Sequence, residues 1–435
     1  MDPHAALWQN CLQLAFLSDI GLRRGNNQDS LAVVTASSQE KWETRGHFFV
    51  VADGMGAHAA GELASKLATD IIPLAYHKLS DRSPPEALVA AVREANAQIY
   101  TRGTANEEFR GMGTTVSALA LLPQGALVAH VGDSRVYRLR NARLEQLTFD
   151  HSLVWELQAA GQLADAEVPS CIPKNIITRS LGPNPEVQVD LEGPFPCLPG
   201  DTFLLCSDGL SGQVSDEEIG KILASLPPDE AVRVLVDLAN LRGGPDNITI
   251  IVARHTAPQT SSEPAAPSRA AEPARPPRSP IHPAVWSTLG LCALATGGLL
   301  AVGQWLGAGV ALAGAAVAGV VALLQRYSVP TTTPFDGRPL GRGPHRAAQC
   351  APDAVFVREL TRVVQQVCDA ASGSRWKIEW APFRRHVADA EDAAAKSDWA
   401  AATAGYCRAV MAMMAELRRQ GENVASANGN RNGPR

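Results

Sequence analysis

The stretch VVADGMGAHAAGE, residues 50–62, joins an apolar run to an aspartate and a group of glycines. Residues 48–52, which lead up to the aspartate, are all apolar, which is typical of a strand buried on both faces. A carboxylate at the tip of such a strand is unfavourable unless a nearby group compensates its charge. The glycines behind it indicate a sharp turn or a close approach of the backbone. The sequence around Asp53 therefore predicts a partner for a buried charge.

The composition of the chain disfavours several classes of protein. Its 435 residues are too many for one ordinary domain, and its formal net charge is −5. Acidic and basic residues are mixed throughout, whereas a nucleic-acid-binding surface needs clustered basic residues. The 8 cysteines are scattered without a CxxC pair, which disfavours a zinc ribbon and a secreted disulfide framework. We therefore expect free thiols in a reducing compartment and no nucleic-acid partner.

Residues 12–255 have the pattern of one α+β domain. Apolar runs such as HFFVVADG, TTVSALALL, GDTFLLCSDG and NITIIVAR are strand-like, and several of them end on or beside an aspartate. Two helical patterns, at residues 60–79 and 83–103, lie between the first two of these runs. Runs of strands with helices grouped between them indicate α+β layers rather than βαβ alternation.

The middle of the chain predicts a membrane attachment. Residues 256–283 are rich in Pro, Ala and Ser and are expected to form an extended linker. Residues 284–324 carry no charge and fit a transmembrane helical hairpin that turns near GQWLGAG. Arginines flank both outer ends, which places both ends in the cytoplasm and the hairpin in the inner membrane. A single span with an external C-terminal region and a soluble helix pair are the alternatives.

The C-terminal part is predicted to be helical. Residues 325–349 are expected to be a linker, residues 350–421 a helical region of unknown role, and residues 422–435 a disordered tail. One helix face in this region repeats apolar and aromatic residues at helical spacing. It consists of Trp399, Thr403, Tyr406, Val410, Met413 and Leu417. A small helical bundle explains this face, and the alternative is a docking module for a partner or for self-association.

Five aspartates stand at the ends of apolar runs or in turns beside Gly or Asn. They are Asp29, Asp53, Asp133, Asp208 and Asp246. Each one taken alone is best explained as a turn residue. Converging carboxylates, however, cannot all ionise in one place without a cation, and they are the ligands of hard cations such as Mg²⁺ or Mn²⁺. Two cations bridged by carboxylates would stabilise a phosphoryl transfer.

Several motifs occur together in the order of one known family. They are SDIGLRRGNNQD, VVADGMGAHAAGE, GMGTTVSAL, AHVGDSRVYRLR, LTFDHSLVWEL, KNIITRSLG, GDTFLLCSDGL and GGPDNITIIV. This order resembles the bacterial metal-dependent protein phosphatases of type 2C, over about residues 12–255. The resemblance implies a four-layer αββα sandwich of two antiparallel sheets flanked by helices, with the metals at one end. It also implies that residues 150–181 form a flap that shapes substrate access.

The resemblance assigns roles to the aspartates. Asp53 would bridge two metals, and the carbonyl of Gly54 would bind one of them. Asp208 and Asp246 would complete the shell of one metal. Asp29 would act at or near the metal shell through water. Asp133 would hold a third, weaker metal together with Asp208. The remaining polar positions of the motifs, Asp19, Asn27 and Asn247, would support the ligands.

Two further residues would take part in the reaction. Arg24 stands where the family binds the substrate phosphate, and its guanidinium suits two phosphate oxygens. A hydroxide between the metals would attack phosphorus, and His58 would protonate the leaving oxygen. Ala57 replaces the second glycine of the family's DGMGG, which requires a negative φ or room for one methyl group.

The sequence thus predicts a membrane-tethered protein phosphatase with two Mn²⁺ or Mg²⁺ ions, or three. It would hydrolyse phosphoserine and phosphothreonine on proteins and oppose Ser/Thr kinases, so its partners would be those kinases and their substrates. The catalytic part would lie in the cytoplasm of a bacterium. The alternative is a weakly active, phosphatase-like scaffold that recruits partners through its C-terminal helices.

Overall fold

The structure, a computed structural model, describes residues 11–57, 59–163, 173, 176–256, 283–327, 338–372 and 379–429. The chain forms two compact units. The main unit contains the described residues up to 256, apart from residues 81–83, together with those from 338 onward. The second unit, called the hairpin unit here, contains residues 283–327.

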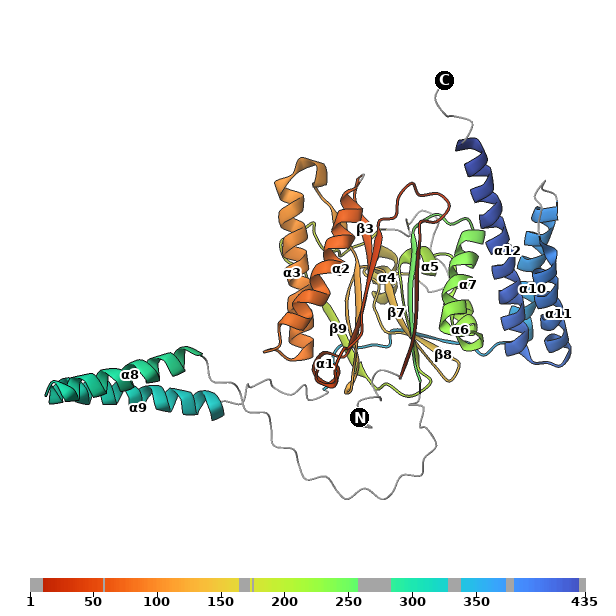
Figure 1. The fold of residues 1–435 in the computed structure, drawn as a ribbon. Helices are drawn as coiled ribbons and strands as arrows, with labels where there is room; N and C mark the ends of the chain where they lie inside the picture. Colours follow the sequence, from red (N-terminus) through yellow and green to blue (C-terminus); the bar gives the residue numbers. More distant parts are fainter. Residues whose placement is uncertain are drawn as a thin grey trace, which may run out of the picture. The chain divides into compact units, whose positions relative to one another are not determined.

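Two antiparallel sheets form the centre of the main unit (Figure 1). The first sheet has the strand order β1-β11-β10-β7-β8-β12, and the second has the order β2-β3-β5-β6-β9 with β4 paired to β3. The strands of the first sheet are β1 (Leu12–Asp19), β7 (Arg135–Arg140), β8 (Arg143–Gln146), β10 (Thr202–Cys206), β11 (Ile248–His255) and β12 (Arg346–Gln349). Those of the second are β2 (Asp29–Val34), β3 (His47–Met55), β4 (Gly113–Thr114), β5 (Val116–Leu122), β6 (Gly125–Val131) and β9 (Asp190–Phe195).

Strand β3 contains the apolar run that precedes Asp53. Phe48 and Val50 pack with the helices outside the second sheet, whereas Phe49 and Val51 pack between the two sheets. This alternation is the period of a strand, and both of its faces are fully buried. The predicted strand is therefore confirmed, and the run is apolar throughout because neither face meets solvent.

Helices cover the outer face of each sheet. α2 (Ala60–Lys78) and α3 (Pro84–Ala105) cover the second sheet, and α6 (Asp216–Ser225) and α7 (Pro228–Leu241) cover the first (Figure 1). Shorter helices are α1 (Gln39–Arg45), α4 (Leu153–Ala159), α5 (Asp208–Ser211) and the 3₁₀ turn at Glu107–Phe109. The predicted sandwich of two antiparallel sheets flanked by helices is confirmed.

The C-terminal helices belong to the same unit as the sandwich. They are α10 (Ala354–Ser372), α11 (Trp380–Ala395) and α12 (Trp399–Gly429). Tyr406, Val410 and Met413 of α12 share one apolar core with Leu235 and Leu238 of α7. The expected face of α12 is thus buried against the sandwich.

Two predicted boundaries in this part are wrong. The segment expected to be a linker, residues 325–349, contains β12, which pairs with β8 from Arg346 to Gln349. The tail expected to be disordered from residue 422 instead continues α12 as far as Gly429. Its composition reads as disordered, yet Glu and Ala near its start favour helix and extend a helix that already exists.

The hairpin unit consists of α8 (Pro283–Ala301) and α9 (Trp305–Tyr327). The chain turns between them at Gly303, which has a φ of 75°, so the predicted break near this glycine is confirmed. The predicted transmembrane character is not supported. Among the helical residues that the structure describes, no helix is both long enough and apolar enough to cross a membrane.

Candidate active site

Two of the predicted site residues face each other on neighbouring strands. Asp29 is the first residue of β2, and it pairs across the antiparallel ladder with Asp53 of β3. Asp133 follows the end of β6, which is linked to β3 through β5. The second sheet thus places these three carboxylates at one end of the sandwich, as the order of the motifs predicts.

The first sheet contributes the other two aspartates. Asp208 follows β10 and begins the short helix α5, and Asp246 lies in the turn before β11. Gly209 lets these two segments meet, because a side chain there would come within 1.9 Å of the backbone oxygen of Asn247. The five aspartates therefore come together from different strands of both sheets, and each lies close enough to act on the charge of Asp53.

The electrostatics of the cluster are those of carboxylates crowded in a low-dielectric site. Burial, followed by the charges of the other four aspartates, raises the pKa of Asp53 well above its ordinary value. Burial likewise raises the pKa of Asp29 to about 7 and that of Asp133 to about 8. The pKa of Asp208 is raised by burial and by Asp246. Such a cluster favours protons or a cation over several uncompensated charges.

Three buried oxygens of the cluster are the strongest sign of a cation-binding site. Oδ1 of Asp29, of Asp133 and of Asp208 is buried and has no hydrogen-bond partner. Buried polar atoms are almost always paired, and hard cations prefer carboxylate oxygens, so these residues fit Mg²⁺ or Mn²⁺. Within the described residues, however, no three His, Cys, Asp or Glu side chains have the arrangement of a metal-binding group. The individual ligand roles stay predictions.

Arg24 reaches the same end of the sandwich. Its Nη2 donates a hydrogen bond to Oδ2 of Asp246 at 2.6 Å, and the Arg24 side chain is 46% exposed. Hydrogen bonding to Asp246 raises the pKa of Arg24, which keeps the guanidinium charged. A half-exposed cation beside a carboxylate cluster is accessible to an incoming anion. Its role in phosphate binding stays a prediction.

Asn247 fixes the loop that carries Arg24. Its Oδ1 accepts a hydrogen bond from the backbone N–H of Gln28 at 2.8 Å, and its Nδ2 donates to the carbonyls of Ile20 and Asn26. Asn27 accepts from the N–H of Asp29, the first residue of β2. Asp19 accepts from the N–H of Gly21 and from Asn240. Asp19, Asn27 and Asn247 thus hold neighbouring backbone in place, which fits the supporting role that the sequence predicts for them.

Gly54 is close to protein backbone. A side chain at this position would lie 2.0 Å from the carbonyl oxygen of Gly61 and 2.5 Å from that of Gln28. The glycine after Asp53 is therefore required by the contact between β3 and the start of α2.

Ala57 is not among the described residues with positive φ, so its methyl group meets no backbone strain. His58, the predicted general acid, lies outside the described residues.

Two hydroxyl groups that orient the aspartates were missed at the sequence level. Thr115 Oγ1 accepts a hydrogen bond from the backbone N–H of Asp53 at 3.0 Å. Ser207 Oγ donates to Oδ2 of Asp29 at 2.7 Å. Both residues stand inside the motifs GMGTTVSAL and GDTFLLCSDGL, but hydroxyl side chains at the ends of strands are common and give no signal of their own.

The predicted flap is only partly described. Its first part forms α4, capped by Ser152, while residues 164–172 and 174–175 lie outside the described residues. The segment before α4 is bound to the turn that carries Asp133. The N–H of His151 donates to the carbonyl of Gly132 at 2.7 Å, and His151 Nδ1 accepts from the N–H of Gly132 at 2.9 Å.

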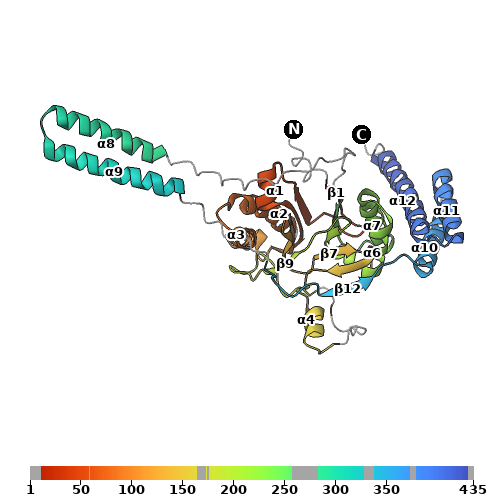
Figure 2. The same ribbon diagram turned by 90° about the horizontal axis from the view of Figure 1, so that it is seen from below.

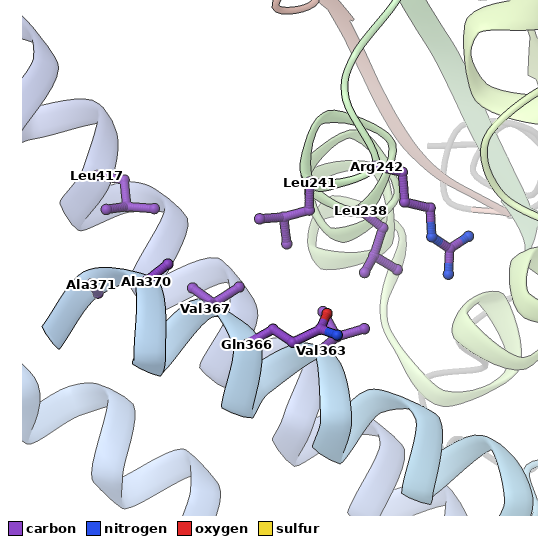
Figure 3. A pocket seen from close by; sticks show the side chains of 9 residues that line it. All are labelled: Leu238, Leu241, Arg242, Val363, Gln366, Val367, Ala370, Ala371 and Leu417. Atoms are coloured by element: carbon purple, nitrogen blue, oxygen red, sulfur yellow. The ribbon is translucent and has the colours of Figure 1, made fainter. Parts of the chain in front are cut away.

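A pocket of about 350 Å³ lies elsewhere, between α7, α10 and α12 (Figure 3). Its lining is apolar apart from Arg242 and Gln366, and it contains none of the site aspartates. Arg242 already donates to the carbonyl of Gln213 and to Glu218. This pocket has no group that could activate water or bind a cation, so the aspartate cluster remains the candidate active site.

Comparisons with known proteins identify the family of the sandwich. Residues 23–238 match the family described as protein phosphatase 2C. The protein phosphatase PhpP of Streptococcus pneumoniae is 38% identical over 243 residues, which are 55% of this chain and 96% of that protein. The serine/threonine phosphatase Stp of Listeria monocytogenes is 35% identical over 249 residues, 56% of this chain and 96% of that protein.

A solved structure gives the same result. The crystal structure of the Mycobacterium tuberculosis serine/threonine phosphatase PstP/Ppp is similar with a TM-score of 0.50 and 37% identity, covering 56% of this chain and 99% of that one. The family therefore extends over the sandwich, and almost the whole length of each relative is matched. The chain belongs to the protein phosphatase 2C family of serine/threonine protein phosphatases.

Proposed function

We propose that the chain hydrolyses phosphoserine and phosphothreonine on proteins with two Mn²⁺ or Mg²⁺ ions, or three, held by its aspartates. The single observation that carries the proposal is the set of buried oxygens without hydrogen-bond partners on Asp29, Asp133 and Asp208. Asp53 lies among them with a strongly raised pKa, so the cluster favours compensating positive charge. Membership of the phosphatase family supports the same reaction.

The chain's own residues would bind and orient the reactants. When bound, the divalent cations supply an activated water and neutralise charge on the phosphoryl group. Asp53 and Asp208 would hold them at the junction of the two sheets, with Asp246 beside them. Arg24 would leave Asp246 in part to donate to the phosphate oxygens, which its exposure allows. His58 stays the predicted donor of a proton to the leaving serine or threonine oxygen.

The test is metal-dependent hydrolysis by the full chain. We expect release of phosphate from a phosphothreonine peptide in Mn²⁺ or Mg²⁺ and its loss in a chelator. Asp53→Asn should lower kcat/KM by at least about 100-fold. Asp70→Asn is the matched control, because Asp70 is exposed on α2 and pairs with Lys66. Turnover that persists in the chelator or in Asp53→Asn would refute the metal mechanism.

The scaffold alternative makes a different prediction. A weakly active scaffold would recruit partners through its C-terminal helices with little metal-dependent turnover, and Asp53→Asn would leave that recruitment unchanged. The buried carboxylate cluster favours the enzyme, because crowded buried carboxylates destabilise a fold in which no bound cation compensates their charge.

The kinase partners and the location of the protein are proposals of the same kind. A phosphatase of this family would reverse Ser/Thr kinase signalling, so phosphorylated kinases and their substrates are the expected partners. Location at the inner membrane, with the catalytic part in the cytoplasm, rests only on the uncharged residues 284–324. Among the described residues, no helix is long and apolar enough to cross a membrane. Recovery of the full chain in the soluble fraction after cell lysis would refute it.

A further inference from the structure

Residues 338–350, called the strap here, form part of the sandwich although they lie far beyond the family match at 23–238. At its start, Leu340 pairs with Gly193 within β9 of the second sheet. At its end, β12 pairs with β8 and forms the edge of the first sheet; β12 is labelled in Figure 2. The strap therefore connects the edges of both sheets through residues that lie outside the family match.

The strap is fixed by buried polar contacts. Oε2 of Glu192 accepts hydrogen bonds from the backbone N–H groups of Arg342 and Gly343 at 2.8 and 2.7 Å. Oε1 of the same glutamate lies 3.0 Å from Nε2 of His345. Glu192 is buried, so these contacts hold the strap at one defined position on β9.

One side chain of the strap reaches α4. The guanidinium carbon of Arg346 lies 3.9 Å from the centre of the Trp155 ring, and its Nη2 donates to Oε1 of Gln158 at 2.7 Å. Both partners lie on α4, one turn apart. A stacked guanidinium that also makes a directed hydrogen bond restrains a short helix in position and in rotation. α4 has only 7 residues, and Arg346 adds to its other contacts, which include Arg135 at 5.7 Å from the centre of the same Trp155 ring and a hydrogen bond from Thr178 to Glu156.

The segment before α4 is bound in turn to the site. His151 makes two hydrogen bonds to Gly132, directly before Asp133. Asp150 accepts from Arg135, two residues after Asp133, at 2.8 Å. The turn that carries Asp133 is therefore bound on both sides by residues that lead directly into α4.

We propose that Arg346 is a positioning residue of the phosphatase. It holds α4 against the sandwich, and through residues 150 and 151 it holds the turn that carries Asp133. The C-terminal part of the chain thus acts on the catalytic site through one arginine. The kinetic side of this inference rests on the proposed metal-dependent reaction, whereas its structural side does not.

Amide hydrogen exchange on the full chain tests the structural side. In Arg346→Ala, we expect the amides of residues 153–159 to exchange on the order of tenfold faster, and those of residues 132–136 to follow in the same direction. Arg346→Lys keeps the charge but not the planar stack, so its exchange rates should lie between those of the parent and those of Arg346→Ala. Gln158→Ala, which removes only the acceptor on α4, should give a smaller change.

The matched control is Arg358→Ala, an exposed arginine on α10 of the same C-terminal part. Unchanged exchange in residues 153–159, or an equal change in the control, would overturn the proposal. A change in α4 without any change in residues 132–136 would also overturn it, because Arg346 would then act on α4 alone.

Kinetics on the same variants test the catalytic side. We expect Arg346→Ala to raise the Mn²⁺ concentration for half-maximal activity about three- to tenfold, with kcat at saturating Mn²⁺ within about twofold. An unchanged Mn²⁺ dependence would overturn the role in positioning Asp133. If the parent chain shows no metal-dependent turnover, the proposed function fails, and hydrogen exchange still decides whether Arg346 positions the turn.

Discussion

His130 is a buried neutral histidine beside the site. Its ring stacks on His151 with 4.9 Å between centroids, and its nitrogens contact Ser117 Oγ and the carbonyl of Gly132. Burial, followed by the charge of His151, lowers the pKa of His130 to about 3. In the unfolded chain His130 therefore binds a proton near pH 6.5, whereas in the folded chain it binds one only near pH 3. The stability contributed by neutral His130 is complete above pH 6.5 and is lost as the pH falls towards 3.

The resulting prediction is an acid-side loss of stability. Between pH 7 and pH 5 the free energy of unfolding should fall by about 2 kcal/mol through His130 alone. Urea unfolding of the parent and of His130→Asn at both pH values isolates the contribution of His130 to the free energy of unfolding, since other groups titrate equally in both proteins. Equal losses in the two proteins would show that His130 is not the group responsible.

Gly54 gives a second prediction at the scale of one residue. Gly54→Ala would place a methyl group 2.0 Å from the carbonyl oxygen of Gly61, and neither backbone can move without disturbing β3 or α2. We expect the free energy of unfolding to fall by about 2 kcal/mol or more. Gly25→Ala is the control, because its methyl group would meet no atom within 4 Å. A thermal midpoint of Gly54→Ala equal to that of Gly25→Ala would contradict this reading.

At the scale of elements, sequence reasoning succeeded where signals were local and strong. The apolar run into Asp53 predicts β3 because a strand buried on both faces has no polar alternative. The aspartates were grouped because they stand at the ends of apolar runs or in turns, and the family motifs assigned the site to one end of the sandwich, since periodicity does not encode strand order. β12 was missed because Arg346–Gln349 is a short strand without β-branched or aromatic residues. Its partner β8 is distant in the sequence, and such pairing leaves no local trace.

α12 provides the prediction for an element. Met413 is buried in the core that α12 shares with α6 and α7, so Met413→Ala should leave a cavity there. We expect the free energy of unfolding to fall by about 2–4 kcal/mol. Ala415→Ser on the exposed face of α12 should change it by less than about 0.5 kcal/mol. If α12 unfolds on its own, Met413→Ala would instead split the transition measured by circular dichroism and by phosphatase activity.

At the scale of the whole molecule, the sandwich and the C-terminal helices of the main unit share one core. The apolar core under α6 and α7 continues into α10 and α12, and Arg408 of α12 pairs with Glu230 of α7 at 2.8 Å. Lys221 of α6 pairs with Asp353 just before α10 at 2.9 Å. Sandwich, strap and C-terminal helices therefore constitute one compact unit, interrupted in sequence by the hairpin unit.

Two deletions separate these contributions. A chain that ends at residue 259 lacks the strap and the C-terminal helices, which uncovers apolar side chains of α6 and α7. We expect its thermal midpoint to fall on the order of 10 °C, because several kcal/mol of burial are lost. A chain in which a flexible Gly/Ser linker replaces residues 260–334 keeps those contacts and should melt within about 2 °C of the parent. Equal midpoints for the chain ending at 259 and the parent would contradict a shared core. A large loss in the second deletion would mean that the hairpin unit also stabilises the sandwich.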